Sequence, residues 1–287
     1  MKKKILKITA FLTALCLIGV ILFFADAFLG NPVSYFLAKN SAERILREEY
    51  SEENYVVESV SYFFESGYTV VVASPSETDC HFDMKFNSWG KFKRDTYESD
   101  ILRKGNTMRR LCDEYTFAVA EYLNEDTFPY NADYCYGYVE FSSSDNKIIG
   151  VDGSIGSHLP EYPYEKLVLN KEYDLNEVGS IAGQIIVGVS DPDVSEEKAA
   201  EILLKIKTIL DNADIRFNCV NLILREHVNH TENEKTLWCE GFLYSDITEE
   251  NLIENVRECV KKTEDRYDGE EEQETEEYGS ESHSFAE

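Results

Sequence analysis

The spacing most suggestive of metal binding belongs to two histidines three residues apart. His227 and His230 could bind one ion from the same face of a helix, because residues three apart are neighbours there. They lie instead in the polar stretch 226–231, which joins two predicted strands and offers no third ligand. We therefore interpret both histidines as turn residues and predict no metal site.

An oxygen-rich cluster offers a second candidate. Asp191, Asp193, Ser195, Glu196 and Glu197 have the side-chain chemistry that Ca²⁺ prefers. They lack the ligand spacing and the glycine of a calcium loop. Residues of these types at the start of a helix cap its free amides and complement its dipole, so we interpret the cluster as a helix start.

A glycine-containing segment, residues 152–158, places Ser154 and Ser157 near His158. Such a segment could form a phosphate loop or a Ser/His pair. It has no lysine and is not followed by a helical pattern, so it does not match either motif. We interpret it as a turn.

Cys80 and His81 lie between Asp79 and Asp83, a combination that could activate a thiol. Adjacent residues of a strand point to opposite faces of the sheet, so this thiol and this imidazole cannot pair directly. We predict no catalytic, cofactor-binding or metal-binding residues and no cofactor.

The charge balance excludes one class of partner. The chain has 287 residues and a formal net charge of −27. A strongly acidic protein repels polyanionic partners, both the phosphates of nucleic acids and the headgroups of anionic lipids, so we predict no nucleic-acid partner and do not expect binding to a flat membrane surface.

Residues 8–25 contain no charged side chain, follow four lysines and precede Asp26. This length reaches across the hydrocarbon core of a bilayer. The positive-inside rule then places the N-terminus in the cytoplasm and the C-terminal domains outside. The pattern predicts an α-helical membrane anchor over residues 1–30. A cleaved signal peptide, with a site in residues 25–27, is the alternative.

Six cysteines follow the predicted anchor, and none has CxxC spacing. Outside the cytoplasm they could form disulfides in fifteen pairings, which the sequence does not distinguish. Buried free thiols are an equally good interpretation. The six are Cys80, Cys112, Cys135, Cys219, Cys239 and Cys259.

Residues 31–125 predict an α+β domain. A helix begins near Pro32, and a second helix begins at residues 105–107, with Asn106 or Thr107 as its N-cap. Between them, alternating apolar patterns separated by turn residues predict an antiparallel meander. The predicted strands are residues 55–64, 68–73, 80–86 and 91–97.

Residues 126–267 predict a second α+β domain of β-α-β-β-α order, which is ferredoxin-like. Its missing strand could be supplied at the sheet edge by residues 134–141. Segments 193–197 and 246–250 share one pattern, and each is expected to open a helix. Residues 268–287 lack apolar periodicity, which predicts a disordered acidic tail.

Several short stretches resemble the YfjL-like family of singly anchored envelope proteins of Gram-positive bacteria. They include residues 30–34, 74–76, 79–82, 95–98 and 105–111. Cys80 departs from the small polar residue expected in the family. The resemblance implies the topology and a bacterial surface location, but it carries over no catalytic or ligand residues.

The predicted anchor and the two predicted compact domains together favour a non-enzymatic binding or interaction module of the cell envelope, with a protein or peptide partner. The alternative is an exported hydrolase whose active site is dispersed along the chain. His81 and the acids near it are the only candidates for such a site.

Overall fold

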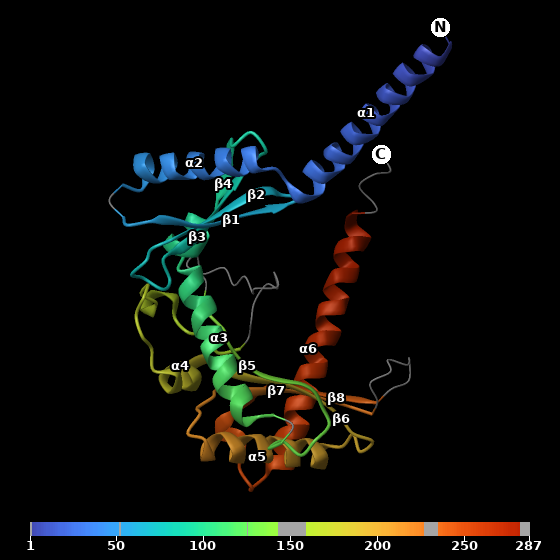
Figure 1. Ribbon diagram of the computed structural model, residues 1–287. Helices are drawn as coiled ribbons and strands as arrows, with labels where there is room; N and C mark the ends of the chain where they lie inside the picture. The colour runs from blue at the N-terminus through green and yellow to red at the C-terminus, as the bar shows by residue number, and fades with distance from the viewer. Residues whose placement is uncertain (1, 52, 125, 143–158, 227–234, 282–287) are drawn as a thin grey trace. The chain divides into compact units, whose positions relative to one another are not determined.

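The computed structural model describes residues 2–51, 53–124, 126–142, 159–226 and 235–281 (Figure 1). The chain divides into two compact units. Unit 1 comprises Met1–Thr107 and Val168–Lys171, and unit 2 comprises Met108–Leu167 and Glu172–Glu287. The boundary therefore differs from the expected one at residue 125. The structure has mixed α+β architecture, with one four-stranded sheet in each unit.

Helix α1 spans Lys2–Leu29 and precedes the globular part of unit 1. In the described part of the chain, no helix meets the combined requirements of length and apolar character for a membrane span.

The sheet of unit 1 is the predicted antiparallel meander. Strands β1 (Val56–Phe63), β2 (Gly67–Ala73), β3 (His81–Phe86) and β4 (Phe92–Asp95) lie in the order β1-β2-β3-β4. The predicted meander is confirmed. Because tight turns join consecutive strands, each strand pairs antiparallel with the next one along the chain.

Helix α2 (Pro32–Glu49) lies across one face of this sheet (Figure 1). Asn31 caps it by accepting a hydrogen bond from the Ser34 amide at 2.8 Å. Proline at the first helical position needs no amide partner, so the sequence Asn-Pro sets the start of the helix. The core between helix and sheet is formed by Ala38, Ala42, Ile45, Leu46, Tyr68, Val70, Val72, Phe82, Met84, Phe86 and Ile101.

A π-helical turn, η1 (Glu98–Leu102), leads into α3 (Gly105–Tyr122). The predicted N-cap at Asn106 or Thr107 is wrong, because both residues lie inside the first turn of α3. Their side chains instead bind the segment before β3, as described below. These side chains form hydrogen bonds with residues distant in the sequence, so they do not cap the helix.

The sheet of unit 2 has the order β5-β6-β7-β8. Its strands are β5 (Ala132–Val139), β6 (Gly183–Ser190), β7 (Cys219–Arg225) and β8 (Thr236–Leu243). β5 takes the edge position that the sequence suggested, antiparallel to β6. β6 and β7 pair directly and in parallel, whereas β7 and β8 are antiparallel.

The predicted ferredoxin-like topology is wrong. A split βαβ unit needs a strand between the two parallel strands, and here β6 and β7 are neighbours. Helix α5 (Glu196–Asn212) makes the crossover between them. β5 pairs with the other edge of β6, so β8 forms the opposite edge of the sheet.

Helices α3, α4 (Leu175–Ala182), α5 and α6 (Leu252–Glu281) contribute to the core of unit 2. α4 was not predicted. The two remaining short helices, η2 (Tyr164–Lys166) and η3 (Tyr244–Asp246), are of the 3₁₀ type. The largest fully buried side chains here are Leu111, Tyr115, Leu167, Ile185, Ile202, Leu203, Ile206, Leu210 and Leu222.

Of the two segments that share the predicted helix-start pattern, 193–197 and 246–250, only the first begins a helix. Ser195 caps α5 by accepting from the Lys198 amide, and Glu196 and Glu197 lie in its first turn, as predicted. The second prediction is wrong, since α6 begins at Leu252, after residues 246–250. The Asp246 carbonyl instead accepts a hydrogen bond from the Asn255 side chain.

The backbone of α6 continues as far as Glu281, into the segment that we expected to be disordered from Asp268. Glutamate and glutamine have good helix propensity, and adding a residue to an existing helix avoids the cost of nucleation. Residues 282–287 lie outside the described part of the chain.

Candidate functional site

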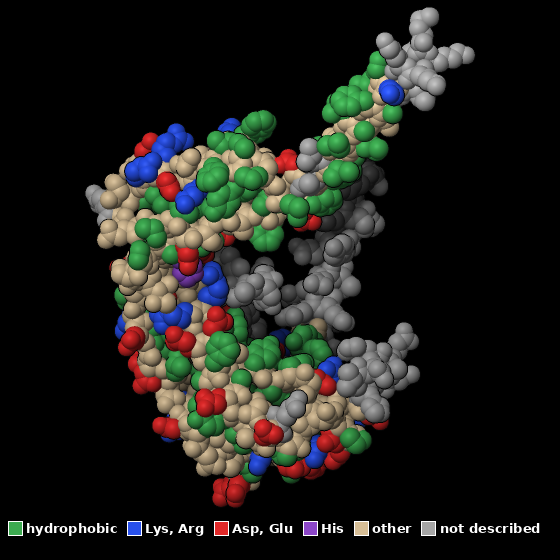
Figure 2. Space-filling view, in the orientation of Figure 1, with side chains coloured by type: hydrophobic (Ala, Val, Ile, Leu, Met, Phe, Trp, Pro, Cys, Tyr) green, Lys and Arg blue, Asp and Glu red, His purple; other side chains and the backbone are tan. Residues whose placement is uncertain are grey.

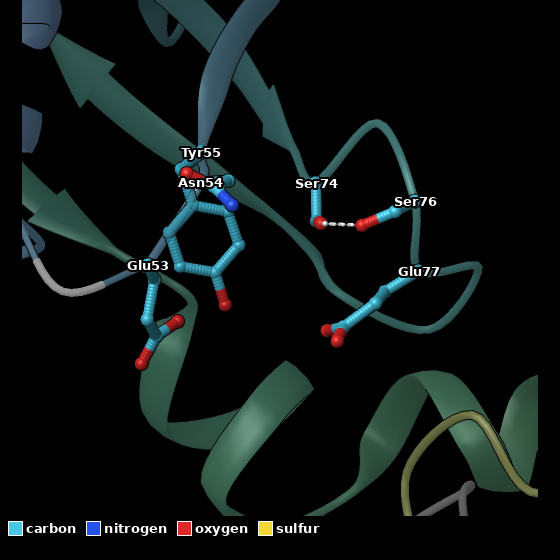
Figure 3. A pocket seen from close by; sticks show the side chains of 6 residues that line it. All are labelled: Glu53, Asn54, Tyr55, Ser74, Ser76 and Glu77. Carbon is cyan, nitrogen blue, oxygen red and sulfur yellow. Dashed lines mark hydrogen bonds between the residues drawn. The ribbon is translucent and has the colours of Figure 1, made fainter.

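A polar pocket opens in unit 1 where β1 begins and β2 ends. Glu53, Asn54 and Tyr55 line one side, and the other side comes from the loop after β2 (Figure 3). The two segments meet because Val56 pairs with Ala73 at this end of the strands. The pocket has a volume of about 210 Å³, and the loop contributes Ser74, Ser76 and Glu77.

Aromatic rings form the wall behind the pocket. The ring of Tyr55 lies 5.2 Å from that of Phe82 in an edge-to-face arrangement, and Tyr50 and Tyr97 are 4.9 Å apart. Such contacts fix the rings, so the Tyr55 hydroxyl is held at the pocket with little freedom to move.

Hydrogen-bond acceptors dominate the lining. The Glu53 carboxylate accepts a hydrogen bond from the Tyr97 hydroxyl at 3.1 Å, and Ser74 and Ser76 are 3.4 Å apart. The Tyr55 hydroxyl is buried without a hydrogen bond of normal geometry in the described structure. Burial, followed by Glu53, raises the pKa of both Tyr55 and Tyr97. These phenols therefore stay neutral donors near two carboxylates.

Cys80 lies beside the pocket and is only 6% exposed. The side-chain amide of Asn170 donates to its sulfur at 3.3 Å. Burial, followed by hydrogen bonding to Glu77, raises the pKa of the Cys80 thiol to about 11. Because the thiolate is the nucleophile, this cysteine is unreactive near neutral pH.

Asp79 connects the segment before β3 to α3 and to residues 168–171 of the same unit. Its buried carboxylate accepts hydrogen bonds from the Thr107 hydroxyl at 2.7 Å and from the backbone amide of Asn170 at 2.9 Å. Asn106 donates to the backbone carbonyls of Asp79 and His81 at 2.7 and 2.6 Å. This network, here called the Asp79 clamp, fixes the loop that carries Glu77 and Cys80.

His81 does not join this network through its side chain. Its Nδ1 lies 3.1 Å from the Thr78 carbonyl on an exposed part of the strand end. The buried thiol of Cys80 instead meets Asn170. The structure therefore does not bring Cys80 and His81 together as a catalytic pair.

At the oxygen-rich start of α5, two of the carboxylates have partners within the chain. Asp191 accepts a hydrogen bond from the Asp193 amide at 2.9 Å and lies 3.7 Å from the Lys198 ammonium. Glu196 pairs with Arg257 at 3.1 Å. Among the residues that the structure describes, no group of three or more His, Cys, Asp or Glu could hold a metal ion.

Two candidates lie outside the described residues, namely the segment 152–158 and the pair His227 and His230. All seven cysteines are free thiols. The Cys259 thiol lies 3.5 Å from the carbonyl oxygen of Glu240, next to buried Cys239.

The sequence analysis did not identify the pocket residues. Glu53 and Tyr55 are separated from Glu77 by two strands, so no local motif connects them. The turn residues Ser74 and Ser76 marked only a break between strands. Pairing of β1 with β2 was the signal that could have placed the two segments together.

The burial of Cys80 gives a testable result. In a variant that keeps Cys80 as its only cysteine, alkylation by iodoacetamide should be at least tenfold slower near neutral pH than after unfolding in urea. The folded-state rate should rise as the pH approaches about 11. Equal rates in the folded and unfolded protein would contradict the described environment of this thiol.

Comparison with known families gives two matches. Residues 2–93 match the YfjL-like N-terminal domain, and residues 114–257 match the YfjL-like C-terminal domain. No curated protein and no solved structure gives a significant match. The two family matches cover most of both units, so the chain belongs to the YfjL-like family.

Proposed function

We propose that this protein is a non-catalytic binding module of a Gram-positive cell envelope, held at the membrane by α1 with both units outside the cytoplasm. The pocket of unit 1 is the proposed binding site, and the ligand is a peptide or another molecule with a free ammonium group. The observation that carries the binding role is the convergence of carboxylates and hydroxyls on this pocket.

The anchor rests on the chemistry of α1. Leu12, Leu15, Leu17, Ile18 and Val20 are all more than half exposed. Successive residues of a helix lie about 100° apart, so these side chains are apolar on every side of α1. Figure 2 shows the hydrophobic side chains along this helix. A helix that is apolar all round favours a lipid environment over water.

The proposed anchor also rests on the sequence of α1 and on the charges at its two ends. The uncharged run 8–25 includes Leu22 and Ala25, whose side chains lie outside the described residues. The lysines before this run and Asp26 after it favour a cytoplasmic N-terminus. Residues 30–281 then follow on the far side of the membrane.

Charge supports an ammonium ligand. The six lining residues include Glu53 and Glu77 and no lysine or arginine. An ammonium group has three donors and no acceptor, so it complements a site that presents mainly acceptors. Hydrogen bonds between ionised partners are the stronger kind, and they would make both carboxylates important for binding.

The binding role can be tested with the full chain in lipid nanodiscs. A short peptide with a free α-amino group and the same peptide N-acetylated are titrated separately and followed by calorimetry. The free peptide should bind saturably, and acetylation should weaken binding by about tenfold or more, since the charge is lost.

Matched variants locate the site. Glu53→Gln with Glu77→Gln should weaken binding as much as acetylation does, whereas Glu58→Gln should not. Glu58 is an exposed glutamate of β1 in the same unit and does not line the pocket. Equal binding of the two peptides, or full affinity in the double variant, would refute the proposed site.

A further inference from the structure

Large apolar side chains are exposed at the end of unit 1 where α1 meets the sheet. They come from α2, from the β1–β2 turn and from the β3–β4 connection, and Trp89 is 83% exposed. We call this surface the aromatic end. It consists of Val33, Phe36, Phe63, Phe64, Trp89 and Phe92.

Three contacts place these segments beside one another. The rings of Phe28 in α1 and Phe64 stack with centroids 5.1 Å apart. Lys93 donates to the carbonyl of Ser66 in the β1–β2 turn at 3.5 Å. Gly90 packs so tightly on Leu37 of α2 that a Cβ there would lie 2.8 Å from its backbone. The aromatic end therefore lies beside the point where α1 ends.

The connection between α1 and α2 is short and held in place. Only Gly30 and Asn31 separate Leu29 from Pro32, which allows a span of at most about 10 Å. The Tyr68 hydroxyl accepts a hydrogen bond from the Asn31 amide at 2.7 Å and lies 3.1 Å from the Asn31 carbonyl. Gly30 has a φ of +70°, which favours glycine. A helix in the membrane would thus bring this end of unit 1 to the bilayer surface.

The charges near the aromatic end also suit a lipid surface. Lys91, Lys93 and Arg94 are exposed on the β3–β4 connection and β4. The chain as a whole carries −27, so this concentration of cations is local. Aromatic rings and long basic side chains are the residues that occupy the interface between hydrocarbon and water.

We propose that the aromatic end lies in the headgroup region of the same bilayer that holds α1, so that unit 1 rests on the membrane surface. This inference rests on the proposed anchor. It adds a second membrane contact, made by the folded unit itself, and it makes a lipid headgroup layer the partner of this surface.

Trp89 is a natural probe for this contact, because the chain has only two tryptophans, Trp89 and Trp238. The full chain with Trp238→Phe is reconstituted in phosphatidylcholine vesicles containing lipids brominated close to the headgroup. Flotation of the vesicles first shows whether the chain is inserted. Trp89 should then have blue-shifted emission, and the brominated lipid should quench it about twofold or more, while aqueous iodide should quench it weakly.

The matched control is Trp89→Phe, which leaves Trp238 in unit 2 as the probe. Its emission should respond to iodide and not to the brominated lipid. Phe63→Ser with Phe64→Ser in the Trp238→Phe background should reduce lipid quenching of Trp89 if the aromatic end acts as one surface.

The outcomes separate the two proposals. A chain that floats with the vesicles but has Trp89 open to iodide overturns the membrane contact and leaves the anchor intact. Protection of Trp89 that disappears on dilution of protein in lipid, without lipid quenching, identifies a second copy and also overturns it. A chain that does not float refutes the anchor and, with it, this contact.

Discussion

Replacing Leu15 and Ile18 with arginine is expected to move the chain from the membrane fraction to the soluble fraction of cells. Both residues lie near the middle of the uncharged run 8–25. An arginine at the centre of a membrane helix costs about 2.5–3.5 kcal/mol, so two oppose insertion by about 5–7 kcal/mol. Fractionation of the cells, followed by immunoblotting, measures the distribution.

The control is Phe117→Arg, because Phe117 is 75% exposed on α3 of unit 2. This variant adds charge to an exposed apolar position outside α1 and should stay in the membrane fraction. Retention of the double-arginine variant in the membrane after an alkaline wash would argue against α1 as the anchor.

The second large effect concerns the Asp79 clamp. Asp79→Ala is expected to destabilise unit 1 by about 3 kcal/mol, because it removes two hydrogen bonds to a buried carboxylate and leaves their donors unpaired. Those donors are the Thr107 hydroxyl and the backbone amide of Asn170. Native-state hydrogen exchange of the β2 and β3 amides measures the opening free energy in this unit alone.

Asp83 provides the comparison, since it lies on β3 in the same unit. Its side chain is 38% exposed and 3.5 Å from the Lys85 ammonium. Exposed ion pairs contribute little, so Asp83→Ala should cost less than about 1 kcal/mol. Should the two substitutions have the same effect on exchange, the buried network would not be what holds the loop before β3.

The elements that the sequence predicted are those whose pattern is local. Alternation and turn residues suffice for β1 to β4, and the stripe of Leu111, Tyr115 and Val119 predicts the buried side of α3. In α2, the Asn-Pro pair fixes the helix start by its own chemistry.

Long-range features could not be predicted in this way. The side chains of Asn106 and Thr107 bind Asp79 and the backbone near it, and no local pattern signals such partners. Strand order in unit 2 depends on which edge of β6 is taken by β5. The pocket combines Glu53 with Glu77 through strand pairing, so its chemistry appears only after the sheet has formed.

These two units share a chain but differ in what they offer to partners. Unit 1 has the acceptor-lined pocket and the aromatic end, which lie on a compact core of α2 and four strands. Unit 2 has the larger core, to which four helices and one sheet contribute. The proposed binding and membrane contacts therefore both belong to unit 1, whose globular part directly follows α1.

The central claim is that α1 places both units on the outer side of the membrane. Alkaline phosphatase fused after Glu287 tests it, because this reporter becomes active only outside the cytoplasm, and a green fluorescent protein fusion at the same site is the complement. The account predicts an active phosphatase fusion and a dark fluorescent fusion. A fluorescent C-terminus with an inactive phosphatase would contradict it.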